Sequence, residues 1–232
     1  ADNSTTYMSF FSQMDTYGDG YAGIGVWRAA FKPLVDRIAD TDIRLQWFCC
    51  DRSTGVTDAS GKRVTLIRDT KYPVSVEYQT VKFIGTGRDN IKAGVFSGWE
   101  LGDYIYLRSE EAYMIKMEAL AHKGSADAIT ELNSFMKTRQ PDYNYTFTNK
   151  ADLIEEIIYQ KRVEFWGEGL EYIDNRRLNI PVDRTDETWG AENNNHFSAG
   201  KFRYNQEERP FLYQLPLSEI ENNSQLSPTD QN

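Results

Sequence analysis

The sequence predicts a mainly α-helical fold in which tetratricopeptide-like helical hairpins form an alpha/alpha superhelix, with long irregular loops and a few short β-hairpins. Apolar residues recur at helical spacing between residues 104 and 177. A glycine followed by a serine separates the first two helical segments, and an asparagine precedes a third. The segments on either side are rich in Gly, Asn and other polar residues, which is typical of loops.

The first predicted helix spans residues 104–122 and has a broad apolar face. That face contains Ala112, Met114, Ile115, Met117, Ala119 and Ala121. Gly124 then offers a left-handed stop, and Ser125 can cap a second helix. The apolar residues of the second helix are Ala128, Ile129, Leu132, Phe135 and Met136. Because the connection is so short, we expect antiparallel helices, with the small side chains of Ala119 and Ala128 allowing close approach.

A third helix is predicted after Asn149, whose side chain can cap it with Asp152 three residues on. Its apolar residues are Ile154, Ile157, Ile158, Phe165 and Trp166. Gly167 and Gly169 interrupt this helix, and a short fourth helix over residues 170–177 is expected to follow.

The first hundred residues predict less regular structure. A helix is expected over residues 26–38 despite Pro33. Asp42 and Arg44 are interpreted as a structural ion pair. Residues 51–100 alternate apolar and polar side chains between turn residues, which predicts short β-hairpins and loops.

The chain is predicted to be a single domain with three regions. Residues 1–100 form an irregular, loop-rich region, residues 101–180 the helical scaffold, and residues 181–232 an irregular C-terminal return. The net charge of −9 shows no electrostatic footprint for nucleic acid. Cys49 and Cys50 are adjacent, which provides neither a disulfide framework nor a zinc site, so we expect no metal and no cofactor.

Four motifs stand in order along the second half of the chain. They are YLRSEEAYMIKMEALA with Arg108, Glu111, Glu118 and Ala119; Leu132-Asn133 followed by FMKTR; the charged series Arg162, Glu164, Glu168, Gly169, Asp174 and Arg177; and LPLSEIENN from Leu215. Together they resemble the SusD/RagB family of outer-membrane nutrient-binding lipoproteins of Bacteroidetes-type bacteria. The resemblance covers the C-terminal half of such a protein and departs from its pattern at Ser109, Gln160 and Glu171.

The resemblance implies a non-catalytic protein on the outer surface of the cell outer membrane. Such proteins capture oligosaccharides or peptides and deliver them to a TonB-dependent transporter of the SusC class. This chain shows no signal peptide, no N-terminal cysteine that could accept a lipid and no apolar run of about 18 residues. We therefore expect that any membrane attachment is through a lipid anchor outside this chain, and that the natural protein is longer.

Paired carboxylates such as Glu164 and Glu168 also permit a glycoside hydrolase hypothesis. We favour a structural role, because these charges lie among aliphatic residues on helices, where ion pairs usually fix helix register. No GxSxG or HExxH motif is present, and His122 and His196 are the only histidines, which argues against acyl-transfer and zinc chemistry.

The candidate ligand-binding residues are aromatic and amide side chains in the irregular segments. They are Tyr7, Tyr17, Tyr21 and Trp27, with Trp189 and Asn194 as a second group. Sugar rings stack on aromatic faces while amides bond their hydroxyls. The same side chains could instead pin the loops onto the helices. A helical-repeat scaffold that binds a protein and no small ligand is therefore an alternative function.

Overall fold

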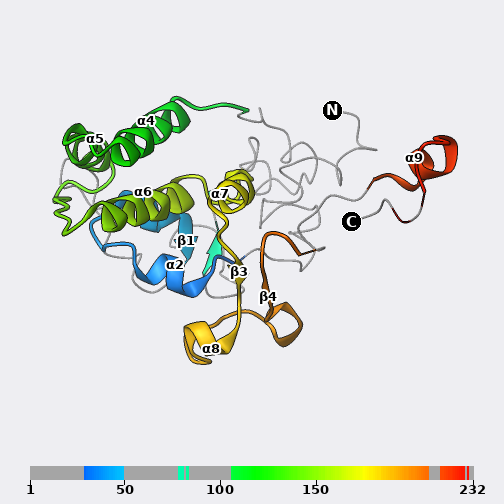
Figure 1. Cartoon of the computed structure of the whole chain (residues 1–232). Coiled ribbons are helices and arrows are strands. Elements are labelled where there is room, and N and C mark those ends of the chain that lie inside the picture. The colour runs from blue at the N-terminus through cyan, green and yellow to red at the C-terminus, as the bar shows by residue number, and fades with distance from the viewer. Residues whose placement is uncertain are drawn as a thin grey trace, which may run out of the picture. The chain divides into compact units, whose positions relative to one another are not determined.

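The computed structural model is mainly helical, as the sequence predicts (Figure 1). It describes residues 29–49, 78–80, 82–83, 106–208, 215–227 and 229. The chain divides into two compact units, residues 1–167 and 168–232. Most of the hairpins predicted for residues 51–100 fall outside the described residues.

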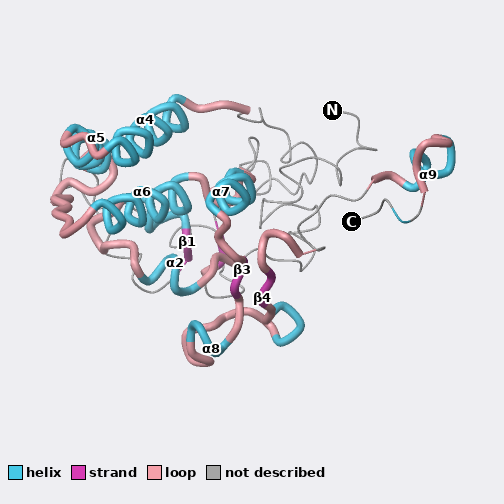
Figure 2. Tube along the Cα trace, in the orientation of Figure 1, coloured by secondary structure: helices cyan, strands magenta, loops and turns pink. Residues whose placement is uncertain are grey.

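The predicted helical hairpin is present in the first unit. Helix α4 spans Ser109–Lys123 and helix α5 spans Asp127–Met136, and the two pack against each other (Figure 2). Between them Gly124 adopts a left-handed conformation with φ of 72°, which a glycine reaches without steric cost. Ser125 Oγ accepts a hydrogen bond of 3.2 Å from the Asp127 N–H, but the N-cap position of α5 is Ala126, one residue later than predicted.

The buried face of α4 is narrower than predicted. Met114, Met117, Glu118 and Ala121 are buried, whereas Ala112, Ile115 and Ala119 are exposed. These two sets lie on opposite sides of the helix, because 3.6 residues complete one turn. The prediction that Ala112, Ile115 and Ala119 belong to the buried face was therefore wrong. The helix also begins at Ser109 and not at residue 104.

Helix α6, Lys150–Glu164, packs against α4. Its cap is the predicted one, since the Asn149 side chain accepts a hydrogen bond of 3.0 Å from the Asp152 N–H. The helix ends before residues 165–166, which the sequence placed inside it, and Gly167 follows with φ of 77°.

Helix α2 is much shorter than the predicted helix over residues 26–38. It spans Lys32–Asp36, with Pro33 in its first turn. Proline lacks an N–H and fits the first turn of a helix, where that group has no intrahelical partner. The proline therefore marks the start of this helix within the described residues.

Short elements connect α2 to the rest of the unit. The 3₁₀ helix η2, Ile43–Trp47, leads into strand β1, Phe48–Cys49, which pairs antiparallel with β2, Gln79–Thr80. Together with α6 they enclose a hydrophobic core. Its buried residues are Ala30, Val35, Ile38, Leu45, Phe48, Tyr78, Tyr159 and Val163. Helix α6 thus contributes one face to this core and another to its contact with α4.

The second unit begins with the predicted short helix and continues with small elements. They are α7 Leu170–Leu178, β3 Val182–Asp183, α8 Asp186–Trp189, η5 Ser198–Gly200, β4 Arg203–Tyr204 and α9 Leu217–Asn222. Strands β3 and β4 pair antiparallel. The region predicted to be irregular therefore includes short helices and one two-stranded pairing.

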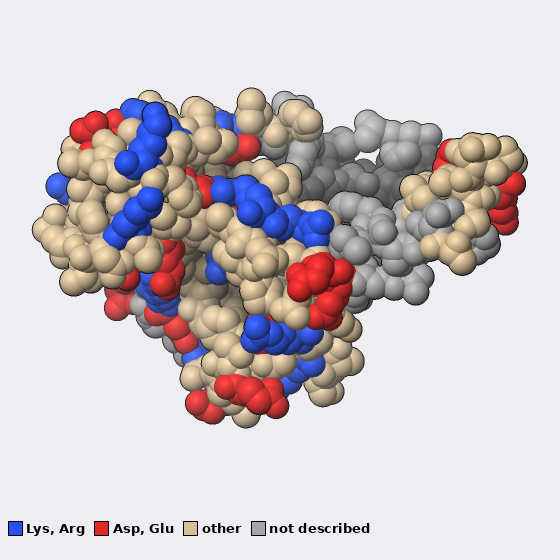
Figure 3. Space-filling view, viewed as in Figure 1, with Lys and Arg blue, Asp and Glu red and all other residues tan. Residues whose placement is uncertain are grey.

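On the face shown in Figure 3, basic and acidic side chains lie beside one another. Across the parts of the chain that the structure describes, no helix has both the length and the apolar composition to cross a membrane.

Candidate functional site

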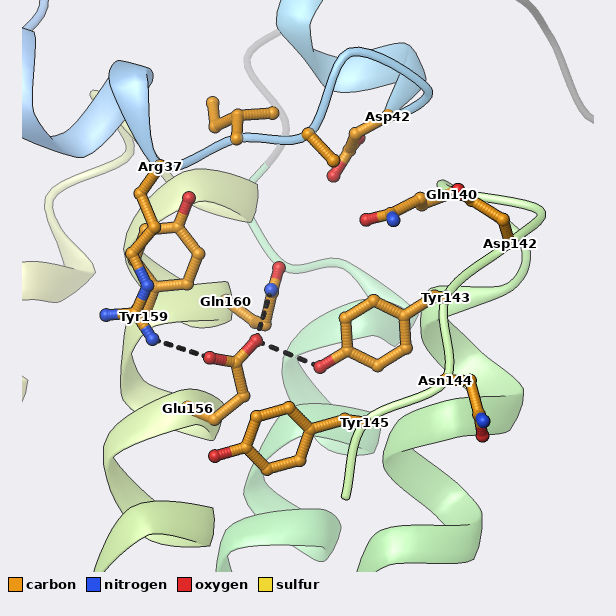
Figure 4. Close-up of a pocket in the computed structure, with 12 residues that line it drawn as sticks. Arg37, Asp42, Gln140, Asp142, Tyr143, Asn144, Tyr145, Glu156, Tyr159 and Gln160 are labelled. Carbon is orange, nitrogen blue, oxygen red and sulfur yellow. Dashed lines mark hydrogen bonds and ion pairs between the residues drawn. The ribbon is translucent and has the colours of Figure 1, made fainter. Parts of the chain in front are cut away.

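A cavity of about 380 Å³ lies in the first unit, between α6 and the segment 139–145 that follows α5 (Figure 4). The end of α2 contributes Arg37 to its wall. This volume is at the lower end of the roughly 300–1,000 Å³ that is usual for ligand pockets. The cavity is therefore large enough for a small ligand or for one end of a longer one.

The Glu156 carboxylate lies at the centre of the wall that α6 provides. It accepts hydrogen bonds of 2.9 Å from the Tyr143 hydroxyl, 2.7 Å from Gln160 Nε2 and 2.6 Å from Arg37 Nη2. Glu156 and Gln160 are one helical turn apart on α6, which places both side chains on the cavity side. These donors come from three separate segments, so the carboxylate has a fixed orientation.

Tyrosine rings form much of the remaining wall. Tyr143 and Tyr145 are nearly parallel, with ring centroids 6.4 Å apart and an angle of 17° between the planes. The Arg37 guanidinium lies 3.9 Å from the centroid of the Tyr159 ring. Burial, followed by the neighbouring Glu156 charge, raises the pKa of Tyr143. Its phenol therefore stays protonated and donates to Glu156 at ordinary pH.

This cavity was not predicted from the sequence, because all the candidate ligand residues were assigned to the irregular segments outside the helical scaffold. Tyr143, Tyr145, Glu156 and Tyr159 all lie within the region assigned to the scaffold. One signal was present in the sequence. Two tyrosines separated by one residue follow the second helix, and in an extended segment this spacing places both rings on the same side.

The first group of predicted ligand residues, Tyr7, Tyr17, Tyr21 and Trp27, lies outside the described residues. The second group, Trp189 and Asn194, belongs to the second unit. Neither fact tests whether these side chains contact a ligand, so both groups remain predictions.

The structure places the polar groups of Trp189 and Asn194 inside their own loop. Trp189 Nε1 donates to the Asp183 carbonyl at 2.9 Å, while its side chain keeps an exposed fraction of 37%. Asn194 is buried, and its amide donates to the Arg184 carbonyl and to Asp186 Oδ1 at 3.0 and 2.8 Å. Asn194 thus fixes the loop, and of the two side chains it is the Trp189 ring that presents surface.

Glu164, one residue of the charged series, lies at the centre of a buried cluster and has an exposed fraction of 1%. Arg139 donates to both carboxylate oxygens at 3.0 and 3.2 Å. Arg108 Nη1 lies 3.2 Å from Oε1, and Arg44 Nη1 lies 3.4 Å from Oε2. Arg44 also pairs with Asp42 at 2.7 Å, so the predicted structural ion pair is confirmed.

The same cluster closes the C-terminal end of α6. Lys82 Nζ donates to the Glu164 and Trp166 carbonyls at 2.7 and 3.0 Å, and Arg108 Nη2 donates to the Glu164 carbonyl at 3.0 Å. Cations at this end satisfy carbonyls that lack intrahelical partners and complement the helix dipole. With Arg44 and Arg139, these residues join α6 to four other segments, namely η2, the residues after β2, the start of α4 and the segment after α5.

The carboxylate pair behind the hydrolase hypothesis does not share a helix face. Glu164 ends α6, and Gly167 turns the chain before Glu168 is reached. Their spacing of four residues therefore does not place the two carboxylates on one side of a helix. Among the described residues, no group of three His, Cys, Asp or Glu side chains could hold a metal ion.

Comparison with known proteins identifies the family of this chain. The family model for the SusD family matches residues 34–232. The chain belongs to the SusD family. A solved SusD-like carbohydrate binding protein from Bacteroides vulgatus is similar to it, with a TM-score of 0.63 and 21% sequence identity. The similarity covers 93% of this SusD-family chain but only 44% of that protein, so the chain spans less than half of its relative. No curated protein matches the chain significantly.

Proposed function

We propose that this SusD-family chain is part of a non-catalytic nutrient-binding protein on the outer face of the outer membrane. It captures oligosaccharides and delivers them to a TonB-dependent, SusC-like transporter. The family match over residues 34–232 carries this proposal. The structural neighbour, a SusD-like carbohydrate binding protein, supports a glycan ligand.

The chemistry of the chain agrees with a neutral ligand that has apolar ring faces and hydroxyl groups. The chain contains 14 Tyr and 5 Trp, and its net charge is −9. Aromatic rings offer flat apolar surfaces for the C–H faces of sugars, while carboxylates and amides bond sugar hydroxyls. The candidate contacts remain Tyr7, Tyr17, Tyr21 and Trp27, together with the Trp189 ring.

An interaction scaffold is the second candidate function, and the exposed side of α4 favours it. Ala112, Ile115 and Ala119 are exposed along one side of this helix, and Ile115 has an exposed fraction of 60%. Apolar side chains that a folded unit leaves exposed often mark protein contacts. In the proposed function the same surface is available for the transporter, so the two candidates differ in whether the chain also binds a glycan.

A glycan array followed by isothermal titration calorimetry tests the proposed function. The purified chain is expected to bind a subset of neutral oligosaccharides and to leave them chemically unchanged after prolonged incubation. Retention of tetrapeptides with no retention of glycans would contradict glycan capture. Release of shorter sugars from a bound oligosaccharide would contradict the non-catalytic assignment.

A further inference from the structure

We propose that the cavity between α6 and the segment 139–145 is a binding subsite for a single neutral sugar ring. This proposal rests on the proposed function and adds a location for one part of the ligand. The lining comes from residues 37–42 after α2, from α6 and from the segment after α5.

The first argument is the combination of ring faces and polar groups in one small space. Tyr143 and Tyr145 stand on one side of the cavity and Tyr159 on the other, with Glu156 between them (Figure 4). A pyranose has apolar C–H faces and a rim of hydroxyls, each of which can donate and accept. Rings beside polar groups match both features, whereas a purely apolar ligand would cover the polar groups of the lining without forming new hydrogen bonds to them.

The second argument is that the wall is fixed before a ligand arrives. Glu156 accepts from Tyr143, Gln160 and Arg37, which lie on three different segments. Binding then requires little ordering of these side chains, and such ordering otherwise subtracts from affinity. The Arg37 side chain remains 45% exposed, and its Nη1 lies 3.8 Å from Glu155 Oε1.

The third argument concerns charge. The Glu156 carboxylate is paired with Arg37 at 2.6 Å, and the Asp42 carboxylate with Arg44 at 2.7 Å. A cationic ligand would have to displace Arg37 or Arg44 to reach either carboxylate, which leaves Asp142, hydrogen-bonded to Thr41, as the lining carboxylate that it could approach directly. A neutral saccharide can add hydrogen bonds without breaking either pair, so we favour it over a cationic peptide.

The fourth argument is the presence of adaptable polar groups at the loop side. Figure 4 shows the Gln140 amide directed toward the cavity. An amide supplies both a donor and an acceptor and suits the mixed hydrogen bonding of sugar hydroxyls. Asp142 also lines the cavity, and its Oδ1 accepts a hydrogen bond of 2.6 Å from Thr41 Oγ1.

Two variants of the full chain test the proposal. Ala39 lines the cavity, so Ala39→Phe fills it without removing a polar group, and Gln140→Ala removes one amide. The matched control is Ala151→Phe, which adds the same bulk at an exposed position on α6. The probes are the neutral disaccharides maltose, cellobiose, lactose, mannobiose and xylobiose, titrated by calorimetry, with thermal unfolding recorded for each variant.

At least one disaccharide is expected to bind the unmodified chain. Ala39→Phe should then weaken its binding at least tenfold, Gln140→Ala about twofold to tenfold, and Ala151→Phe not at all. If none of the disaccharides binds, or if a cooperatively folded Ala39→Phe binds as well as the unmodified chain, the subsite is refuted. Competition by trilysine alone would assign the cavity to a cationic peptide and overturn the proposal.

The outcomes for the subsite and for the proposed function are distinguishable. Array glycans that bind Ala39→Phe and the unmodified chain equally would refute the subsite and leave glycan capture intact. Absence of binding to every array glycan by the unmodified chain would refute glycan capture itself.

Discussion

Replacing Glu164 with alanine is expected to lower the free energy of unfolding by about 3–5 kcal/mol, the usual cost of removing one partner from a buried ion pair. The substitution leaves Arg44 buried with only part of its compensation and removes the carboxylate through which Arg108 and Arg139 pair with α6. Urea unfolding followed by circular dichroism measures the change.

Glu155→Ala is the matched control, because it removes a carboxylate from the same helix at an exposed position. Glu155 Oε1 lies 3.8 Å from Arg37 Nη1, and both side chains are exposed. We expect a change within about 0.5 kcal/mol for this control. Equal destabilisation by the two substitutions would show that the Glu164 cluster does not hold the unit together.

The Glu164 cluster also predicts a pH dependence. Burial alone would raise the pKa of Glu164, but the hydrogen bond from Arg139 and the charges of Arg44 and Arg108 outweigh it and lower the pKa. Stability from a lowered carboxyl pKa is fully present above the unfolded-state pKa and is lost as the pH falls through the folded-state value. From about pH 4.5 downward, the unmodified chain should therefore lose more stability than Glu164→Gln. If the free energies of unfolding of the two chains fell in parallel as the pH was lowered, this prediction would be contradicted.

Replacing Arg44 with alanine is expected to lower the free energy of unfolding by a similar amount, about 3–5 kcal/mol. Its side chain is 1% exposed and lies between the carboxylates of Asp42 and Glu164, which would keep their burial but lose a cation. Urea unfolding gives the magnitude. The exposed Lys137→Ala serves as the control and should leave the transition unchanged.

A double-mutant cycle separates the Arg44–Glu164 pair from other effects of the two changes. Because the residues share one network, the double variant should be less destabilised than the sum of the single variants. Strict additivity would indicate that the two side chains act independently, and would contradict the cluster as a unit.

The helices that the sequence predicted best are those with local signals. Gly124 has the positive φ expected of a helix stop, and Asn149 forms the predicted cap. The buried side of α4 could not be predicted, because both Ile115 and Met114 are apolar. Which of them is buried depends on where α5 and α6 pack, and that is a tertiary property.

The candidate site was less predictable than the frame. The structural role of Glu164 followed from its aliphatic surroundings and is confirmed by its burial and its arginine partners. The cavity depends on side chains 37 and 156, whose contact spans 119 residues of sequence. No local pattern reports such a contact, so Arg37 and Glu156 could be assigned to one site only from the structure.

The central claim is that the Glu164 cluster holds the helical frame while other residues capture the glycan. Calorimetric titration of Glu164→Gln with the strongest array glycan, beside urea unfolding of the same sample, tests it most directly. The account predicts a lower free energy of unfolding with glycan affinity unchanged within about twofold, a difference well below the 1.4 kcal/mol of a tenfold change. Loss of glycan binding with an unchanged unfolding transition would contradict it.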